Sequence, residues 1–252
     1  MTPDFPLLLD GGMGSALIER GLLPGQAPEL WLLEQPGQIS SVHRSFIDAG
    51  ADIIQTASFG ANRARLGQHD SLAGRTVELC TLAAELAREA VDSLTDPTRE
   101  VLVAGNIGPA FAWLDSDSLD EDQLSDIFAE AALALANAGV DLISIETMCD
   151  VREARAAVVG ARQSALPVIA SMTFGQTQGG FQSLAGNSLE DCLNALETAG
   201  ATAVGLNCNL DSRQTRLLAM SALTMTELPL AVQPCAGQPS ELSGKLAYPE
   251  TT

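Results

Sequence analysis

Short hydrophobic runs alternate along the chain with longer segments in which apolar residues recur at helical spacing. Most of the short runs do not alternate between polar and apolar positions, as expected for strands that are buried on both faces. These runs cover residues 7–9, 53–54, 101–103, 142–145, 168–170, 203–206 and 230–232. The helical segments cover residues 39–48, 76–93, 124–137, 151–163, 189–198 and 212–222. This repeated strand–helix order predicts a parallel sheet.

Polar and small residues mark the ends of several predicted helices. Ser188 and Asp150 precede helical segments and are of the types that cap a helix amino terminus. Three helical segments finish in an Ala-Gly pair, with Gly50, Gly139 and Gly200, and each is soon followed by a strand. Glycine at these places predicts a left-handed backbone that ends the helix.

Seven such strands in 252 residues favour an α/β fold of the (β/α)8 TIM-barrel type over an open doubly wound sheet. Because seven strands are counted, the barrel is expected to be truncated or incomplete at the eighth strand. The glycine-rich stretch 10–14 has the wrong spacing for the Gly-x-Gly-x-x-Gly fingerprint of dinucleotide-binding folds. No linker or low-complexity tract interrupts the chain, so residues 1–252 are expected to form one barrel domain.

The charge of the chain excludes some classes of partner. With 13 Lys and Arg against 32 Asp and Glu, the formal net charge is −19. This charge argues against nucleic-acid binding and against docking on anionic membranes. No apolar run approaches the ~20 residues of a membrane helix, and the amino terminus lacks the basic start of a signal peptide. A cytoplasmic location is therefore expected, and five cysteines without a pairing pattern fit reduced thiols there.

Polar residues collect where the predicted strands end, which is where barrel enzymes place their chemistry. Asp10 and Glu146 each close an apolar strand, and Asn106 and Asn207 follow two others. Asp10 alone could equally cap a helix or bind a loop amide, whereas a long acid such as Glu146 at a buried strand end needs a partner. The functional interpretation is that the two acids receive the ammonium of an amino-acid substrate, while nearby glycine amides take its carboxylate.

The five cysteines divide by position. Cys80 and Cys192 fall within helical segments and are expected in the core. Cys208 and Cys235 fall at the ends of neighbouring strands, where thiols are well placed to bind zinc. Cys149 follows Glu146, and the favoured interpretation of this thiol is packing rather than metal binding.

Several short stretches, spread over nearly the whole chain, carry a resemblance to one known family. They are Leu-Leu-Asp-Gly-Gly-Met-Gly-Ser at 8–15, Ala-Gly-Ala-Asp-Ile-Ile-Gln-Thr at 49–56, Gly-Asn-Ile-Gly-Pro at 105–109, Ile-Glu-Thr at 145–147, Gly-Leu-Asn-Cys at 205–208, Ala-Gly at 236–237 and Tyr-Pro at 248–249. Together these stretches resemble the homocysteine S-methyltransferase family, a barrel that binds homocysteine through zinc. The stretch 59–63, Phe-Gly-Ala-Asn-Arg, is similar to the methionine synthase branch of that family, specifically to the homocysteine domain of the cobalamin-dependent enzymes.

The resemblance implies a chemistry and roles for particular residues. Cys208 would be a zinc ligand, and Asp10, Gly11, Thr56 and Glu146 would hold the amino-acid end of homocysteine. Zinc would stabilise the thiolate of the substrate, which is the nucleophile, so that no general base is needed at the sulfur. The implied reaction is attack of that sulfur on an activated methyl group, giving methionine.

The chain also departs from the family pattern. The family has two further zinc ligands in a Gly-Gly-Cys-Cys-Gly motif at the eighth strand, which this sequence lacks, and it has Asn where this chain has Cys235. Methionine synthases have Asn where this chain has Ala57. Three explanations stay open: the sequence is shortened, another chain supplies the missing strand, or the metal site is rebuilt from Cys235 with Cys208, with Cys149 a weaker candidate.

The sequence does not encode a methyl donor. It has no Asp-x-His-x-x-Gly cobalamin signature, so the methionine synthase likeness implies a methyl-corrinoid carried by another protein. An open barrel exposes two strand edges, and we expect a partner to cover this gap or the edge to be poorly ordered. Two other functions remain open: a homocysteine-binding or assembly subunit without a competent metal site, and a barrel enzyme that uses Asp10 and Glu146 as acid and base.

Overall fold

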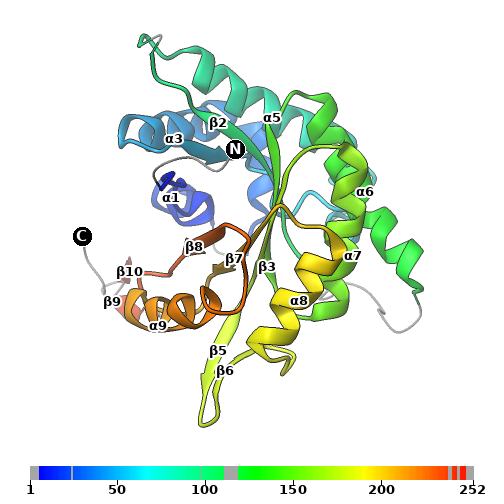
Figure 1. Cartoon of the computed structure of the whole chain (residues 1–252). Helices are drawn as coiled ribbons and strands as arrows, with labels where there is room; N and C mark the ends of the chain where they lie inside the picture. Colours follow the sequence, from blue (N-terminus) through cyan, green and yellow to red (C-terminus); the bar gives the residue numbers. More distant parts are fainter. Residues whose placement is uncertain are drawn as a thin grey trace.

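A computed structural model of the chain describes residues 6–23, 25–96, 98–110 and 119–237, together with the backbone of 240–242 and 245–247. Its centre is a curled parallel sheet (Figure 1). Neighbouring strands follow the order of the chain, which confirms the predicted α/β class. Among the described residues, no pairing joins the last strand to the first, so the barrel is incomplete. In sheet order the strands are β1 (Ile53–Gln55), β2 (Leu102–Ile107), β3 (Leu142–Met148), β4 (Val168–Met172), β7 (Ala203–Asn207) and β8 (Leu230–Gln233).

The first predicted strand, residues 7–9, is reduced to a single parallel bridge between Leu9 and Ile53. The prediction of a full strand there was wrong, because pairing with β1 stops after two hydrogen bonds, from the Ile53 N–H to the Leu8 carbonyl at 3.1 Å and from the Asp10 N–H to the Ile53 carbonyl at 2.9 Å. The second bond fixes Asp10 beside the end of β1.

Helices cover the convex side of the sheet (Figure 1). Small side chains such as Ala83, Ala87 and Ala132 are fully buried, which allows the helices to lie close to the strands and to one another. The helices are α1 (Met13–Glu19), α2 (Trp31–Glu34), α3 (Pro36–Asp48), α4 (Arg63–Leu66), α5 (Thr76–Asp92), α6 (Glu121–Asn137), α7 (Val151–Ala161), α8 (Leu189–Ala199) and α9 (Ser212–Ala222), with short 3-10 turns η1 (Pro28–Leu30) and η4 (Arg162–Ser164).

The predicted helix ends are confirmed. The side chains of Ser188 and Asp150 each accept a hydrogen bond from a backbone N–H in the first turn of the helix that follows. Gly50, Gly139 and Gly200 adopt φ values of 108°, 89° and 95°. These left-handed residues turn the chain from each helix into the next strand.

Strands β4 and β7 approach each other so closely that only glycine fits at position 205. A Cβ atom on Gly205 would lie 2.0 Å from Oγ of Ser171, on the neighbouring strand. This close contact lies three residues before Cys208 and helps to set where β7 ends.

Two hairpins were not predicted. The first, β5 (Phe174–Thr177) with β6 (Gly180–Ser183), projects from the molecule between β4 and α8 (Figure 1). Gln176 on this hairpin accepts a hydrogen bond from Gln214 of α9 at 2.8 Å, which ties the hairpin to the rest of the fold. The second pairs β9 (Ser240–Leu242) with β10 (Lys245–Ala247).

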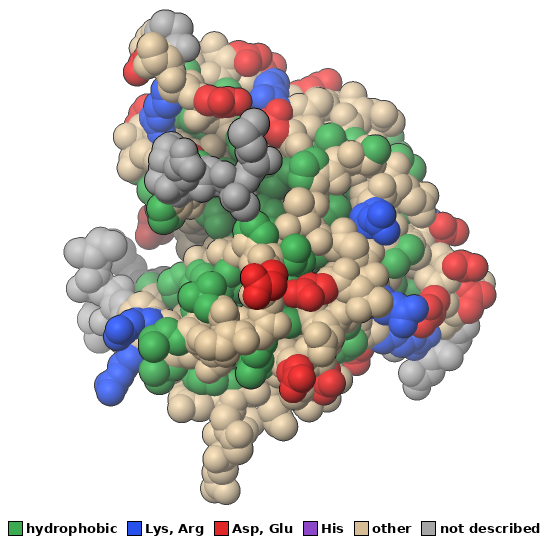
Figure 2. Space-filling model, viewed as in Figure 1, with side chains coloured by type: hydrophobic (Ala, Val, Ile, Leu, Met, Phe, Trp, Pro, Cys, Tyr) green, Lys and Arg blue, Asp and Glu red, His purple; other side chains and the backbone are tan. Residues whose placement is uncertain are grey.

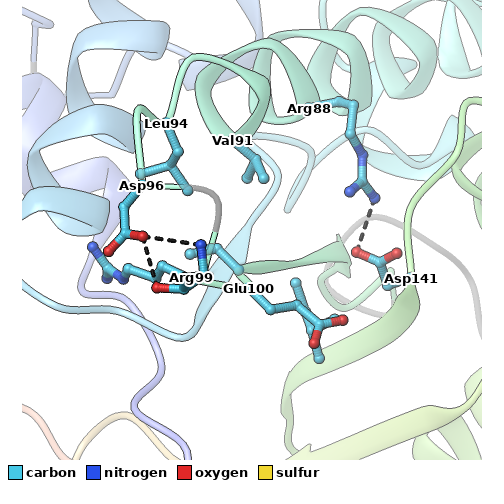
Figure 3. Close-up of a pocket in the computed structure, with 10 residues that line it drawn as sticks. Arg88, Val91, Leu94, Asp96, Arg99, Glu100 and Asp141 are labelled. Atoms are coloured by element: carbon cyan, nitrogen blue, oxygen red, sulfur yellow. Dashed lines mark hydrogen bonds and ion pairs between the residues drawn. The ribbon is translucent and has the colours of Figure 1, made fainter.

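A hollow of about 560 Å³ lies at the amino ends of the strands, opposite the end where the site residues collect (Figure 3). Arg88 of α5 points across it to Asp141 at 2.8 Å and also donates to the Gly139 carbonyl. Arg99 donates to the Ala51 carbonyl at 2.9 Å. Both arginines therefore already bond to protein groups. The hollow lies where α5 meets the amino ends of the strands.

The outer face of α9 and the neighbouring strand β8 carries hydrophobic side chains that are open to solvent (Figure 2). Leu217, Met220 and Leu223 are 50–63% exposed, and Val232 of β8 is 38% exposed. We call this face, made by Leu217, Met220, Leu223 and Val232, the α9 face.

None of the helices in the described part of the chain combines the length and the hydrophobicity that crossing a membrane requires.

Candidate functional site

Four polar side chains meet at the carboxyl ends of β1, β2 and β3. One carboxylate oxygen of Asp10 accepts the backbone N–H of Gln55 at 2.8 Å. The side chain of Gln55 donates to Oε1 of Glu146 at 3.0 Å, and the side chain of Asn106 donates to Oε2 of Glu146 at 3.0 Å. The structure thus brings together Asp10, Asn106 and Glu146, as predicted, and adds Gln55 as the residue that contacts both acids.

Burial changes the acidity of both carboxyl groups. It raises the pKa of Asp10 to about 7, with a smaller upward contribution from the charge of Glu146 and a downward one from the Gln55 hydrogen bond. Burial also raises the pKa of Glu146, against the hydrogen bonds that Gln55, Asn106 and Gln233 donate to the ionised form. The charge of Glu146 therefore adds to burial in disfavouring the ionised form of Asp10, and a nearby cation would favour that form.

Three buried oxygen atoms in this cluster have no hydrogen-bond donor within the described part of the chain. They are Oδ1 of Asp10, Oε1 of Gln55 and Oδ1 of Asn106. Buried acceptors without partners are costly, so a ligand or a water molecule that donates hydrogen bonds to them would be favoured here. An ammonium group has three N–H donors and a positive charge, and it matches both the acceptors and the adjacent carboxylates.

Gly11 and Thr56 lie next to this cluster in the chain. A Cβ atom on Gly11 would lie 2.7 Å from the ring of Phe46, so the backbone beside Asp10 is free of a side chain for packing reasons. The hydroxyl of Thr56 accepts the backbone N–H of Asn106 at 2.9 Å and lies 2.6 Å from the Ser58 hydroxyl. Thr56 is fully buried, and these bonds join the loop after β1 to β2.

The amide of Asn207 is held by the end of β3. Its oxygen accepts the backbone N–H of Thr147 at 3.0 Å, and its nitrogen donates to the Thr147 hydroxyl at 3.0 Å. The Thr147 hydroxyl in turn lies 3.4 Å from the sulfur of Cys208. Asn207 therefore connects β7 to β3 just beside the first candidate metal ligand.

The thiols of Cys208 and Cys235 lie close enough to affect each other. Burial is the main cause that raises the pKa of Cys208 to about 11, and contact with the Cys235 thiol adds to it. The loop positions both: the N–H of Cys208 donates to the Gln233 carbonyl at 3.2 Å, and that of Cys235 donates to the Leu210 carbonyl at 2.9 Å. Both side chains are half-buried.

The other three cysteines lie in the core or beside Thr147. Cys80 and Cys192 are fully buried in the core, which confirms their prediction as packing residues. The sulfur of Cys149 lies 3.4 Å from the Thr147 carbonyl and is half-buried. Among the described residues, no group of three or more His, Cys, Asp or Glu side chains is arranged to hold a metal ion.

Sequence reasoning missed two residues of this region, Gln55 and Thr147. Gln55 could have been found, because it is a polar residue at the end of an otherwise apolar strand. Thr147 gives no such signal, because its contact with Cys208 depends on a left-handed backbone that β-branched residues rarely adopt.

Comparison with known sequences gives consistent matches. A family profile described as homocysteine S-methyltransferase matches residues 7–252. Methionine synthase of Mycobacterium tuberculosis is 31% identical over 211 residues, which cover 81% of this chain and 17% of that protein. Homocysteine S-methyltransferase 2 of Zea mays is 30% identical over 254 residues, which cover 92% of this chain and 74% of that protein. The chain therefore spans about a fifth or less of the mycobacterial methionine synthases that it matches.

Solved structures agree with the sequence matches. The metallated form of the homocysteine methyltransferase MmuM from Escherichia coli has a TM-score of 0.79 and 26% identity, covering 93% of this chain and 85% of that one. Its oxidized form has a TM-score of 0.77 and 27% identity, covering 89% and 80% of the two chains. The Tyr-Pro pair at 248–249, one of the stretches that carry the sequence resemblance, lies outside the described residues. By its sequence, its incomplete barrel and these matches, the chain belongs to the homocysteine S-methyltransferase family.

Proposed function

We propose that this chain transfers a methyl group to the thiol of homocysteine and so produces methionine. The observation that carries the proposal is a pairing of two kinds of group at one end of the sheet. A buried acidic cluster with three unpartnered acceptors, at Asp10, Gln55 and Asn106, lies within electrostatic range of the Cys208 thiol through Glu146. An amino acid that carries a thiol has an ammonium group for the acidic cluster and a sulfur for the end of the site where Cys208 lies.

The two thiols suit zinc in their chemistry, although no third ligand joins them within the described residues. Thiolates are preferred zinc ligands, and Cys208 with Cys235 would hold the ion from neighbouring strand ends. The sulfur of homocysteine would occupy a further position. Zinc, when bound, would lower the pKa of the substrate thiol and keep it as a thiolate at neutral pH.

The residues of the chain then have separate tasks. Asp10 and Glu146 bind the ammonium, and Gln55 and Asn106 orient Glu146 through its two oxygens. Thr56 and Gly11 shape the backbone around that end of the substrate. In the reaction a sulfur–carbon bond forms as the bond between methyl and donor breaks, and the donor leaves with the bonding electrons.

A methyl-corrinoid carried by another protein is our proposed donor. The similarity to methionine synthases supports this choice, and the matched part covers only a small share of those proteins. The α9 face supports a protein neighbour: its exposed hydrophobic side chains adjoin β8, whose outer edge has no strand partner in the described residues. We propose that a further strand–helix unit, or a partner protein, covers it.

The test is zinc content by mass spectrometry together with homocysteine binding by calorimetry, for wild type and Cys208→Ser. Cys149→Ser is the matched control, since its thiol lies nearby and is not assigned to the metal. We expect stoichiometric zinc in wild type and the control, and in Cys208→Ser loss of zinc with homocysteine binding weakened to the level that the acidic cluster alone supports. A methyl-transfer assay with methylcobalamin and with S-methylmethionine as alternative donors identifies the donor class.

The result distinguishes the two leading functions. A binding or assembly subunit would contain little zinc and transfer no methyl group from either donor, while still binding homocysteine through the acidic cluster. Full zinc content in Cys208→Ser would contradict the role proposed for that thiol.

A further inference from the structure

The residues around Cys208 form a closed set of hydrogen bonds that links β3 to β7. Thr147 and Asn207 bond to each other twice, both at 3.0 Å, once through the Thr147 N–H and once through its hydroxyl. The Thr147 hydroxyl and the Asn207 nitrogen both reach the Cys208 sulfur, at 3.4 and 3.6 Å. Cys208 therefore has two polar neighbours that are themselves fixed.

The backbone here is strained. Thr147, Cys208 and Asn209 adopt φ values of 63°, 60° and 60°, a left-handed conformation that is unfavourable for residues other than glycine and most of all for a β-branched one. The register between β3 and β4 also shifts between Ile145 and Met148. Such strain persists only where surrounding contacts hold it, and it is typical of functional sites.

Further bonds hold the strained segment in place. The Thr173 hydroxyl donates to the Asn207 carbonyl at 3.1 Å, and the Thr173 N–H donates to the Met148 carbonyl at 2.8 Å. Asn207 and Thr173 are 6% and 2% exposed. The support is thus buried, so its hydrogen bonds compete little with water.

The partners of Thr147 fix its contact with the sulfur. Its hydroxyl oxygen accepts an N–H from Asn207 at 3.0 Å and lies 3.4 Å from the Cys208 sulfur, and either group can donate in that second contact. Because Asn207 holds the hydroxyl, the hydroxyl in turn limits where the sulfur can lie.

We propose that Thr147 is a positioning residue: clamped by Asn207, its hydroxyl contacts the Cys208 sulfur and fixes where that sulfur lies at the end of β7. The inference rests on the proposed role of Cys208 as a metal ligand. It assigns to Thr147 the task that groups next to metal ligands perform elsewhere, which is to fix the ligand and raise its affinity for the ion.

The first test compares Thr147→Val with Thr147→Ser. Valine keeps the shape and the β-branch but loses the hydroxyl, whereas serine keeps the hydroxyl and tolerates the left-handed backbone better. Zinc affinity is measured by competition with a chromophoric chelator, with thermal unfolding to verify the fold. We expect Thr147→Val to bind zinc about 10- to 100-fold more weakly and Thr147→Ser to restore binding. Thr177→Val, on the exposed hairpin, is the matched control and should match wild type.

A second measurement needs no metal. In zinc-free protein at one fixed pH, the rate at which iodoacetamide alkylates Cys208 is followed by peptide mass spectrometry. We expect an altered alkylation rate in Thr147→Val and a rate near wild type in Thr147→Ser, because a sulfur that the hydroxyl no longer holds in place meets the reagent differently.

The outcomes separate this inference from the proposed function. If Thr147→Val matches wild type in both zinc affinity and alkylation, the positioning role is overturned, whatever Cys208 does. If Cys208→Ser retains zinc, the metal role of Cys208 fails, and the alkylation rates still decide whether Thr147 acts on the sulfur.

Discussion

The two ends of the site are built differently. At the acidic end, Glu146 lies in the middle of the sheet, is 8% exposed, and has both oxygens bonded by Gln55 and Asn106. At the sulfur end, Cys208 and Cys235 are half-buried and lie on the last two strands, beside the open edge. The acidic end is thus complete within the sheet, while the sulfur end depends on a region where the barrel is not closed. Substrate recognition and metal binding should therefore respond to different changes.

The largest effect should come from weakening the sulfur end. Cys235→Ser removes one of two thiols, and loss of a ligand should reduce zinc affinity by more than the 10- to 100-fold that loss of a hydrogen-bonding neighbour costs, so more than about 100-fold. Affinity is measured by chelator competition. Binding of methionine, which has no thiol, should stay unchanged. If zinc affinity is also unchanged, Cys235 is packing, and the metal ligands lie elsewhere.

Weakening the acidic end should have the next largest effect. Glu146→Gln removes the charge that faces the ammonium, and breaking a buried charge contact costs about 2–5 kcal/mol, so kcat/KM for homocysteine should fall about 100-fold. Zinc affinity should not change. Glu78→Gln, an exposed residue that pairs with Arg75 on α5, is the control.

A thiol without the amino group makes this prediction sharper. Binding of 4-mercaptobutanoate should be nearly the same for wild type and Glu146→Gln. Equal losses for this thiol and for homocysteine would mean that Glu146 supports the fold rather than the ammonium.

A smaller effect should follow from pH. Because the pKa of Asp10 is raised to about 7, its ionised form is lost as pH falls below 7, and methionine binding should weaken by about fivefold between pH 7 and 6. Calorimetry at several pH values measures this, and Asp10→Asn should bind more weakly and lose the dependence. An unchanged pH profile in Asp10→Asn would assign the effect to another group.

The same pKa shift predicts that folding stability changes with pH in the opposite direction to ligand binding. The folded state keeps a proton on Asp10 that the unfolded chain releases above its ordinary pKa of 3.8, so the free energy of unfolding falls as pH rises from about 4 to 7. The contribution reaches about 4 kcal/mol at 1.4 kcal/mol per pKa unit. Asp10→Asn should therefore unfold at higher denaturant concentration than wild type at pH 8, although it binds ligand less well.

Much of the fold could be predicted from sequence, because its signals are local. Apolar runs gave the strand order, and Ser188, Asp150 and the three Ala-Gly pairs marked the helix ends through short-range rules. The hairpin β5–β6 was missed although Gln178-Gly179 forms its two-residue turn before a left-handed Gly180, a sequence signal that was available. The strand at 7–9 was overpredicted because three leucines alone do not show where their partner strand ends.

The candidate site was predictable only in part. Position at strand ends indicated Asp10, Asn106, Glu146 and the two thiols, since parallel strands bring their carboxyl ends together. The hydrogen bonds that decide each role were not predictable. The contact between Thr147 and Cys208 joins residues 61 positions apart, and it exists only because both are held at positive φ.

The glycine at position 205 limits how this chain could be re-engineered. Any side chain there would meet Ser171 on the neighbouring strand and disturb the segment that leads to Cys208. A mutant library aimed at the proposed site should therefore leave positions 171 and 205 untouched. It should instead vary the residues around Asp10 and Gln55, where substitutions lie on other strands than Cys208.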